Sequence, residues 1–120
     1  MVGPQLVAAI AAQDTSAIAA CFADDVQLRA LVPPGLRERT GATESAALVA
    51  GWFADSTELE LVGSQTGDVG DRLHISYRFA GVEEGEPYLV EHHLFCIVGE
   101  SGRIERADLL CSGFRPRSAS

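Results

Sequence analysis

The sequence predicts an α+β fold in which helices cover one face of a curved, mostly antiparallel sheet. Two observations predict it: most of residues 1–55 carry apolar side chains at helical spacing, and the residues after them alternate with period two. Successive strands joined by short turns pair antiparallel, so the helices must pack onto the sheet that follows them. A length of 120 residues fits one domain, expected over residues 1–116 with a short tail at 117–120.

Three helices are expected before the sheet, because apolar residues recur every three or four positions. They cover Gln5–Ala12, a segment that begins at a cap offered by Asp14, Thr15 or Ser16 and ends at Asp24-Asp25, and Ala42 to about Asp55. A β-leaning run, Val26–Val32, follows the second helix, and Pro33-Pro34-Gly35 then forces a loop before the third.

The later part of the chain predicts four strands separated by turns rich in glycine and acidic residues. The expected strands are Leu59–Leu61, Leu73–Phe79, Tyr88–Val98 and Ile104–Phe114. The expected turns are Gly63–Gly70, Glu83–Glu86 and Gly99–Gly102. Helices followed by an antiparallel meander are typical of a two-layer α+β domain.

Turn positions set the expected register of the two hairpins. A turn centred on Glu84-Gly85 places Tyr77 beside His92 and Arg78 beside Glu91. A turn centred on Glu100-Ser101 places His92 beside Leu109 and His93 beside Asp108. The sequence thus predicts two cross-strand ion pairs, Arg78 with Glu91 and His93 with Asp108.

Alternation sorts the strand residues onto two faces. The face expected under the helices is apolar and carries Leu73, Ile75, Tyr77, Phe79, Val90, His92, Leu94, Cys96, Ala107, Leu109 and Cys111. The opposite face mixes charges with the apolar groups Phe95, Ile97, Ile104 and Leu110. This outer face is more apolar than solvent contact requires, so we expect a homodimer formed through it.

Composition narrows the classes of partner. Nine Arg, no Lys and 17 acidic residues give a net charge of −8, so nucleic acid is not an expected partner. No apolar run approaches the length of a membrane span, and Met1–Ala12 lacks the positive residues of a secretion signal. The three cysteines, Cys21, Cys96 and Cys111, form no CxxC pair, and an odd number fits reduced thiols in a cytoplasmic protein.

Several segments together resemble the nuclear transport factor 2-like superfamily, in its SnoaL-like and ketosteroid-isomerase-like branches. They are DTSAIAACFADD at residues 14–25, the strand and Pro-Gly loop that follow, Gly41 at a helix start, and SGRIERADLLCSGF at residues 101–114. The resemblance implies a cone-shaped barrel (a cystatin-like roll) wrapped around three N-terminal helices, a dimer, and a small ligand inside the cone. Because the superfamily includes isomerases, cyclases, dehydratases, epoxide hydrolases and binders, the fold does not select a reaction.

The catalytic positions that the resemblance implies carry unsuitable residues. The ketosteroid-isomerase base position matches Ala30, and the oxyanion pair falls near Leu6 and Leu94. An epoxide-hydrolase set would need acidic and basic groups where His92, Val90 and Leu109 stand. The acidic residue of SnoaL-like cyclases falls near Leu109, and the adjacent Asp108 points to the other face unless a bulge intervenes.

The remaining candidate chemistry inside the expected cone is one histidine and one tyrosine. We expect an apolar or aromatic small molecule to be bound by Trp52, Tyr77, Phe79, His92, Leu94, Leu109 and Cys111. A ligand-binding domain without turnover is the first interpretation. The alternative is a cofactor-free isomerase, cyclase or hydratase with His92 as acid/base and Tyr77 as hydrogen-bond donor. Tyr77 and His92 could also only satisfy each other as buried polar groups, and a nucleophilic Cys111–His92 pair stays open.

No metal or other cofactor is expected. His92 and His93 are adjacent on a strand, so their side chains point to opposite faces and cannot chelate one ion. Gly63, Gly67 and Gly70 precede no helix, which argues against a phosphate-binding loop.

Overall fold

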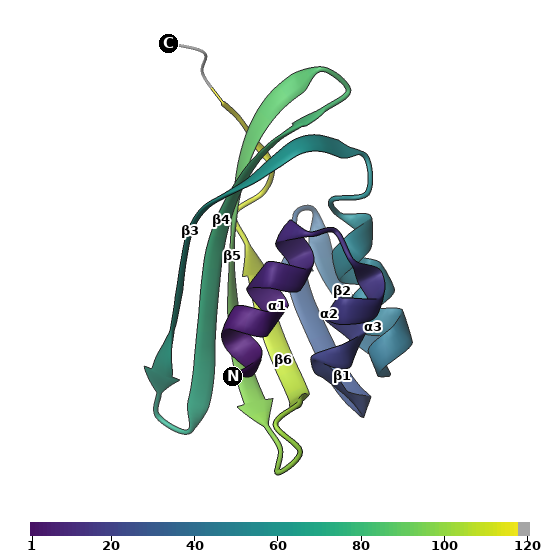
Figure 1. Ribbon diagram of the computed structural model, residues 1–120, viewed down its shortest axis with the longest axis vertical. Helices are drawn as coiled ribbons and strands as arrows, with labels where there is room; N and C mark the ends of the chain where they lie inside the picture. Colours follow the sequence, from purple (N-terminus) through teal and green to yellow (C-terminus); the bar gives the residue numbers. More distant parts are fainter. Residues whose placement is uncertain (118–120) are drawn as a thin grey trace.

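A computed structural model describes residues 1–117 and confirms the α+β fold, with three helices on one side of a curved sheet (Figure 1). The strand order is β2-β1-β6-β5-β4-β3, and the short β7 pairs with β5. All pairs are antiparallel except β1 with β6, whose parallel pairing joins the early strands to the later meander. The sheet is not closed by pairing of its two edge strands, β2 and β3, so the cone has an open side. The predicted tail at 117–120 lies outside the described residues except for Arg117.

The helices are α1 (Val2–Ala11), α2 (Thr15–Ala20) and α3 (Ala42–Gly51). Asp14 caps α2 as expected, accepting a hydrogen bond from the Ala17 backbone N–H at 3.1 Å. The prediction that α2 continues to Asp24-Asp25 was wrong, because Phe22 already lies in β1 and is buried opposite Ile104 of β6. Burial against a distant strand outweighs the helical preference of this segment.

The seven strands are β1 (Phe22–Val32), β2 (Gly35–Thr40), β3 (Ser56–Val69), β4 (Arg72–Glu83), β5 (Glu86–Val98), β6 (Ile104–Cys111) and β7 (Arg115–Pro116). Gly63 and Gly67 lie within β3, so the turn expected at Gly63–Gly70 was wrong. The chain reverses instead at Gly70, whose φ of +62° suits a residue without a side chain. The loop expected at Pro33-Pro34-Gly35 is limited to Pro33 and Pro34, because Gly35 already begins β2.

The third helix ends earlier than predicted, at Gly51 instead of about Asp55. The Gln13 side-chain amide donates a hydrogen bond to the Phe53 carbonyl at 2.8 Å, in the turn that follows the helix. This contact from the α1–α2 turn fixes residues 52–55 as a turn and places Trp52 and Phe53 at the end of α3. Both rings contact His92 in the interior of the cone.

Hairpin register was predicted correctly for one hairpin only. Tyr77 pairs with His92 and Arg78 with Glu91, as expected. In the β5–β6 hairpin, His92 pairs with Cys111 and His93 with Leu110, so the predicted partners Leu109 and Asp108 were wrong. The Gly99 N–H donates to the Arg103 carbonyl across a longer turn, and a bulge follows at Ile97/Val98. The shift is two residues, so the side chains from Arg106 to Cys111 keep their predicted faces. Ile104, which was expected on the outer face, is instead buried in the core, because the bulge reverses the alternation before Arg106.

The core lies between the helices and the concave face of the sheet. Its largest fully buried side chains come from α1, α2, the segment after α3, and strands β1, β4, β5 and β6: Leu6, Ile10, Ile18, Phe22, Leu28, Phe53, Ile75, Tyr77, Phe79, Leu94, Ile104 and Leu109. Within residues 1–117, the helices are too short or too polar to cross a bilayer. The concave face is thus packed with side chains, whereas the convex face is not covered by the helices.

Candidate functional site

The candidate site is a row of three side chains on the concave face of the sheet. Register places Tyr77 of β4, His92 of β5 and Cys111 of β6 side by side. Cys111 is directly opposite His92, where the sequence had placed it diagonally. Trp52 and Phe53, at the end of α3, cover the histidine with ring centroids 5.3 Å and 5.9 Å from the imidazole.

Tyr77 and His92 form a buried hydrogen-bonded pair. The Tyr77 hydroxyl lies 2.8 Å from His92 Nδ1, and both side chains are almost fully buried, at 2% and 0% exposed. Burial lowers the pKa of the imidazole to about 3, with a smaller contribution from neighbouring His93. Burial also raises the pKa of the Tyr77 phenol well above its usual range. Both groups are therefore uncharged at neutral pH.

The other ring nitrogen of this histidine is unpartnered. His92 Nε2 is buried and has no hydrogen-bond partner among the described residues. If the Tyr77 hydroxyl donates to Nδ1, Nε2 carries the proton and is an unused donor; in the other tautomer, Nε2 is an unused acceptor. Either way one hydrogen-bonding position is left over, at a cost of about 1–3 kcal/mol when nothing pairs with it.

The remaining predicted site residues line the same interior with different exposure. Phe79, Leu94 and Leu109 are buried in the core, whereas Trp52 and Cys111 are half-buried at its border. Burial raises the pKa of the Cys111 thiol, and the Gly113 backbone N–H donates to its sulfur at 3.3 Å. A raised pKa opposes formation of the thiolate, so the geometry gives little support to a nucleophilic Cys111–His92 pair.

Two aromatic residues of this region were not among the predicted site residues. Phe53 contacts His92, and Phe114 packs against Phe53 and Tyr88 with ring centroids 5.8 Å and 5.0 Å apart. The sequence placed Phe114 in the last strand, but β6 ends at Cys111 and Gly113, with φ of +85°, turns the chain inward. For Phe53, the available sequence signal was its place on the apolar side of the third predicted helix.

Of the three residues in this row, Tyr77 alone lines one of the five surface hollows described for residues 1–117. Five hollows on residues 1–117 have volumes of about 100 to 480 Å³, and His92 lines none of these five. A molecule that reaches Nε2 must therefore displace a covering side chain. Trp52 is the half-buried ring that contacts His92, so it is the group that has to move.

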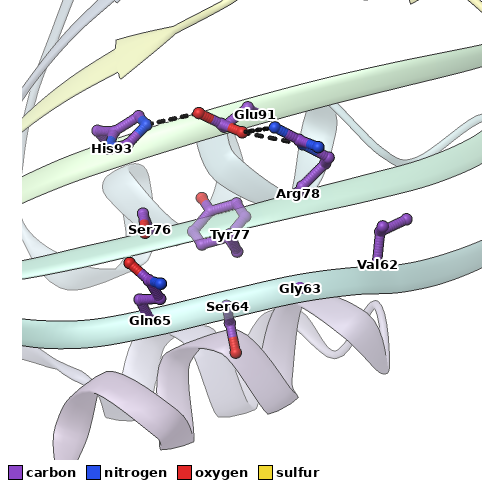
Figure 2. A pocket seen from close by; sticks show the side chains of 9 residues that line it. All are labelled: Val62, Gly63, Ser64, Gln65, Ser76, Tyr77, Arg78, Glu91 and His93. Carbon is purple, nitrogen blue, oxygen red and sulfur yellow. Dashed lines mark hydrogen bonds and ion pairs between the residues drawn. The ribbon is translucent and has the colours of Figure 1, made fainter.

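One hollow, of about 390 Å³, is a groove on the convex face of β3, β4 and β5 (Figure 2). Gly63 of β3 lies opposite Arg78, so the β3 side of the groove has no side chain at this position. The Arg78 guanidinium donates twice to Glu91 Oε1, at 2.9 Å and 2.7 Å, which confirms the predicted ion pair. The predicted His93–Asp108 pair was wrong, because Asp108 instead accepts from Arg29 at 2.9 Å.

The acidic and metal-ligating residues do not converge on the interior. Asp108 points away from the concave face, as the alternation predicted, so it does not stand in for the acidic residue of SnoaL-like cyclases. His92 lies inside and His93 outside the sheet. Among residues 1–117, no three His, Cys, Asp or Glu side chains come together in a set that could hold a metal ion.

Similar solved structures share this fold. A hypothetical protein with a ketosteroid isomerase-like fold from Catenulispora acidiphila, in complex with trimethylamine, is 17% identical, with 90% of this chain and 82% of that chain covered and a TM-score of 0.74. A protein from Xanthomonas campestris assigned as a polyketide cyclase is 21% identical over 91% and 86% of the chains, with a TM-score of 0.71. An epoxide hydrolase of M. tuberculosis, similar to LEH, is 15% identical over 92% and 80%, with a TM-score of 0.67. At these identities the likeness shows the fold alone.

Sequence comparison gives the family. No curated protein matches the chain. The SnoaL-like domain pattern, however, matches residues 5–107, from within α1 to within β6. The chain therefore belongs to the SnoaL-like domain family.

Proposed function

We propose that this protein binds a small, largely apolar or aromatic molecule inside the cone, without turnover, and that His92 Nε2 is its polar anchor. The observation that carries the proposal is the unpartnered, buried Nε2 beneath Trp52. A ligand group that pairs with Nε2 recovers the hydrogen bond that the free protein lacks. The complex of the similar Catenulispora acidiphila protein with trimethylamine supports small-molecule binding in this fold.

Binding is favoured over acid/base turnover by the protonation state of His92. A general acid or base works best when its pKa lies near the working pH, whereas burial lowers the pKa of His92 to about 3. The imidazole is then a weak base at neutral pH and has almost no protonated form with which to act as an acid. The alternative is a cofactor-free isomerase, cyclase or hydratase that uses His92 and Tyr77. It requires the bound ligand to raise the pKa of His92 back toward neutrality.

The ligand can be followed through the only tryptophan of the chain. Small molecules extracted from freshly purified protein would be identified by mass spectrometry and titrated back while Trp52 fluorescence is recorded. We expect a saturable change, because the ring has to move before anything reaches Nε2. Product analysis after long incubation separates the two interpretations: an unchanged ligand supports binding, and conversion supports the enzyme.

Two variants locate the anchor. Tyr77→Phe/His92→Phe replaces both hydrogen-bonding partners with rings of similar size, leaves no polar group unpaired in the pair, and should abolish the fluorescence change. Ser45→Ala is the matched control, since Ser45 Oγ is the other buried side-chain atom without a partner in residues 1–117. Equal loss of binding in both variants, or none in the first, would contradict the assignment of Nε2.

We also propose that two copies associate through the convex face of the sheet. Leu31, Leu36 and Leu110 are each about half exposed, at 52%, 57% and 49%, and adjacent registers join them into a ridge. The groove on β3–β5 lies on the same face at the other side of the sheet. A two-fold axis would set the ridge of each copy against the groove of the other.

The oligomeric state tests this pairing. Light scattering after size exclusion should give a dimer for the native chain and a monomer for Leu31→Arg, because a charge on the ridge would be buried. Leu61→Arg is the control, since Leu61 is also exposed, at 39%, but lies opposite Phe79 and thus on the other face of the sheet. A monomeric native chain would refute the pairing and leave the ligand proposal intact.

A cytoplasmic location is part of the same proposal. Cys21, Cys96 and Cys111 are all free thiols in the structure, which fits a reducing compartment. Thiol titration of the unfolded native protein should give three free groups per chain.

A further inference from the structure

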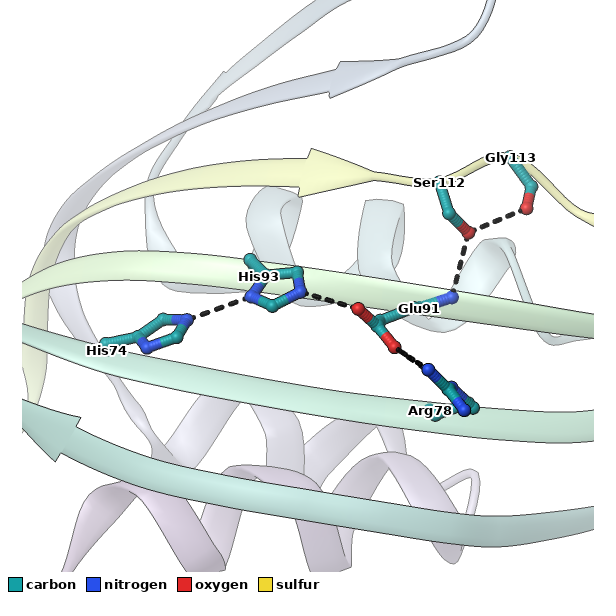
Figure 3. Close-up of polar contacts among 6 residues, drawn as sticks. All are labelled: His74, Arg78, Glu91, His93, Ser112 and Gly113. Carbon is teal, nitrogen blue, oxygen red and sulfur yellow. Dashed lines mark hydrogen bonds and ion pairs between the residues drawn. The ribbon is translucent and has the colours of Figure 1, made fainter.

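A continuous chain of polar side chains crosses the convex face beside the groove (Figure 3). Arg78 binds Glu91 Oε1, and Glu91 Oε2 lies 2.7 Å from His93 Nε2. The other nitrogen of that ring, Nδ1, lies 2.9 Å from His74 Nε2. The ring of His74 is stacked on Phe95, with centroids 4.8 Å apart and an angle of 6° between the planes. The two imidazoles are therefore held in position from both ends.

The hydrogen bonds fix how many protons this pair of imidazoles can hold. A carboxylate only accepts, so His93 Nε2–H donates to Glu91 and, in the neutral ring, Nδ1 accepts from His74 Nε2–H. One added proton fits on His74 Nδ1 without breaking any of these bonds. A second added proton would sit on His93 Nδ1 and set two N–H groups against each other across 2.9 Å. The doubly charged pair must then separate.

The charges around the pair add to this effect. The convex face of β1, β2, β4, β5, β6 and β7 carries five guanidinium groups and three carboxylates: Arg29, Arg72, Arg78, Arg106, Arg115, Glu38, Glu91 and Asp108. On β3, the neighbouring convex-face positions are Gln65 and Gly67, which carry no charge. The hydrogen bonds from His93 and Arg78 lower the pKa of Glu91, so this carboxylate stays ionised in mild acid. Each proton taken up therefore makes the face more positive.

We propose that the association of two copies through this face is gated by protons, with His74 and His93 as the sensor. The inference rests on the proposed dimer. His93 lies beside Leu110 of the ridge and also lines the groove, so the sensor sits between the two halves of the pairing surface. In the proposed pairing the two-fold axis passes between the ridge and the groove, where the sensor lies, so the protonated sensors of both copies meet there and repel. Neutral pH favours the dimer, and mild acid releases it.

Sedimentation equilibrium of the native chain across a series from about pH 7.5 to about pH 5.5 tests the gate. We expect the dimer dissociation constant to rise about tenfold or more toward acid. In His74→Gln/His93→Gln, which cannot take up these protons, the constant should vary less than about twofold. Glu91→Leu should also weaken the acid response, because it removes the acceptor that orients His93.

The outcomes separate this inference from the dimer itself. A native dimer whose dissociation constant is the same at both ends of the series overturns the gate alone. A native chain that is monomeric throughout overturns the dimer and the gate together. Should the double variant fail to fold, imidazole ¹⁵N spectra of the native chain decide instead: a proton shared between His74 Nε2 and His93 Nδ1 supports the sensor, and independent rings refute it.

Discussion

The stability of this protein should depend on pH through the buried His92. Its pKa falls from 6.5 to about 3 on folding, so below about pH 6.5 the unfolded chain takes up a proton that the folded chain refuses. Stability is therefore fully present above the unfolded pKa and is lost as the pH falls from about 6.5 toward 3. Between about pH 7 and pH 5 the loss is about 2 kcal/mol, which is large against the total stability of about 5–15 kcal/mol typical of a domain.

Urea unfolding followed by circular dichroism and Trp52 fluorescence would measure this loss. The His74→Gln/His93→Gln background leaves His92 as the only titrating histidine, since the chain has three. Adding Tyr77→Phe/His92→Phe to that background is the control, in which stability should hardly change between the two pH values. If His74→Gln/His93→Gln is equally stable at both pH values, His92 takes up its proton in the folded state as well. That result would refute a buried, neutral imidazole.

Two further substitutions probe the interior around this pair. Tyr77→Phe alone leaves His92 Nδ1 unpartnered, so urea unfolding should show that the free energy of unfolding falls by about 1–3 kcal/mol. Adding His92→Phe should recover much of this loss. If it does not, the missing hydrogen bond is not the cause. Gly81→Ala would place a Cβ 2.7 Å from the Tyr88 hydroxyl, so the free energy of unfolding should fall by about 1–3 kcal/mol in the same assay. The control is Gly67→Ala, whose added Cβ meets nothing within 4 Å and should lower the free energy of unfolding much less. Similar losses in both variants would rule out the steric explanation.

Local patterns were enough to predict the pair at the centre of the candidate site. Period-two alternation assigned Tyr77 and His92 to the concave face, and the short turn at Glu84-Gly85 set them opposite each other. Both signals depend on residues close together in the chain, where covalent geometry leaves few choices. The ion pair of Arg78 and Glu91 followed from the same register.

Features that depend on distant segments were predicted poorly. The register of β5 with β6 was shifted by two residues, because the longer turn and the bulge at Ile97/Val98 have no distinct sequence signal. The end of α2 was misplaced because Phe22 is buried by Ile104, far along the chain. Such choices depend on which alternative buries more surface in the completed fold.

By itself, then, the sequence determined the order and type of most elements and the face on which most strand residues lie. Only the tertiary structure decided that Trp52 and Phe53 cover His92 while leaving Nε2 without a partner, and that His74 meets His93. The physical reason is that strand alternation is fixed by backbone geometry at each residue. Contacts between a helix end and a sheet, or between diagonal positions on two strands, depend on the packing free energy of the whole domain.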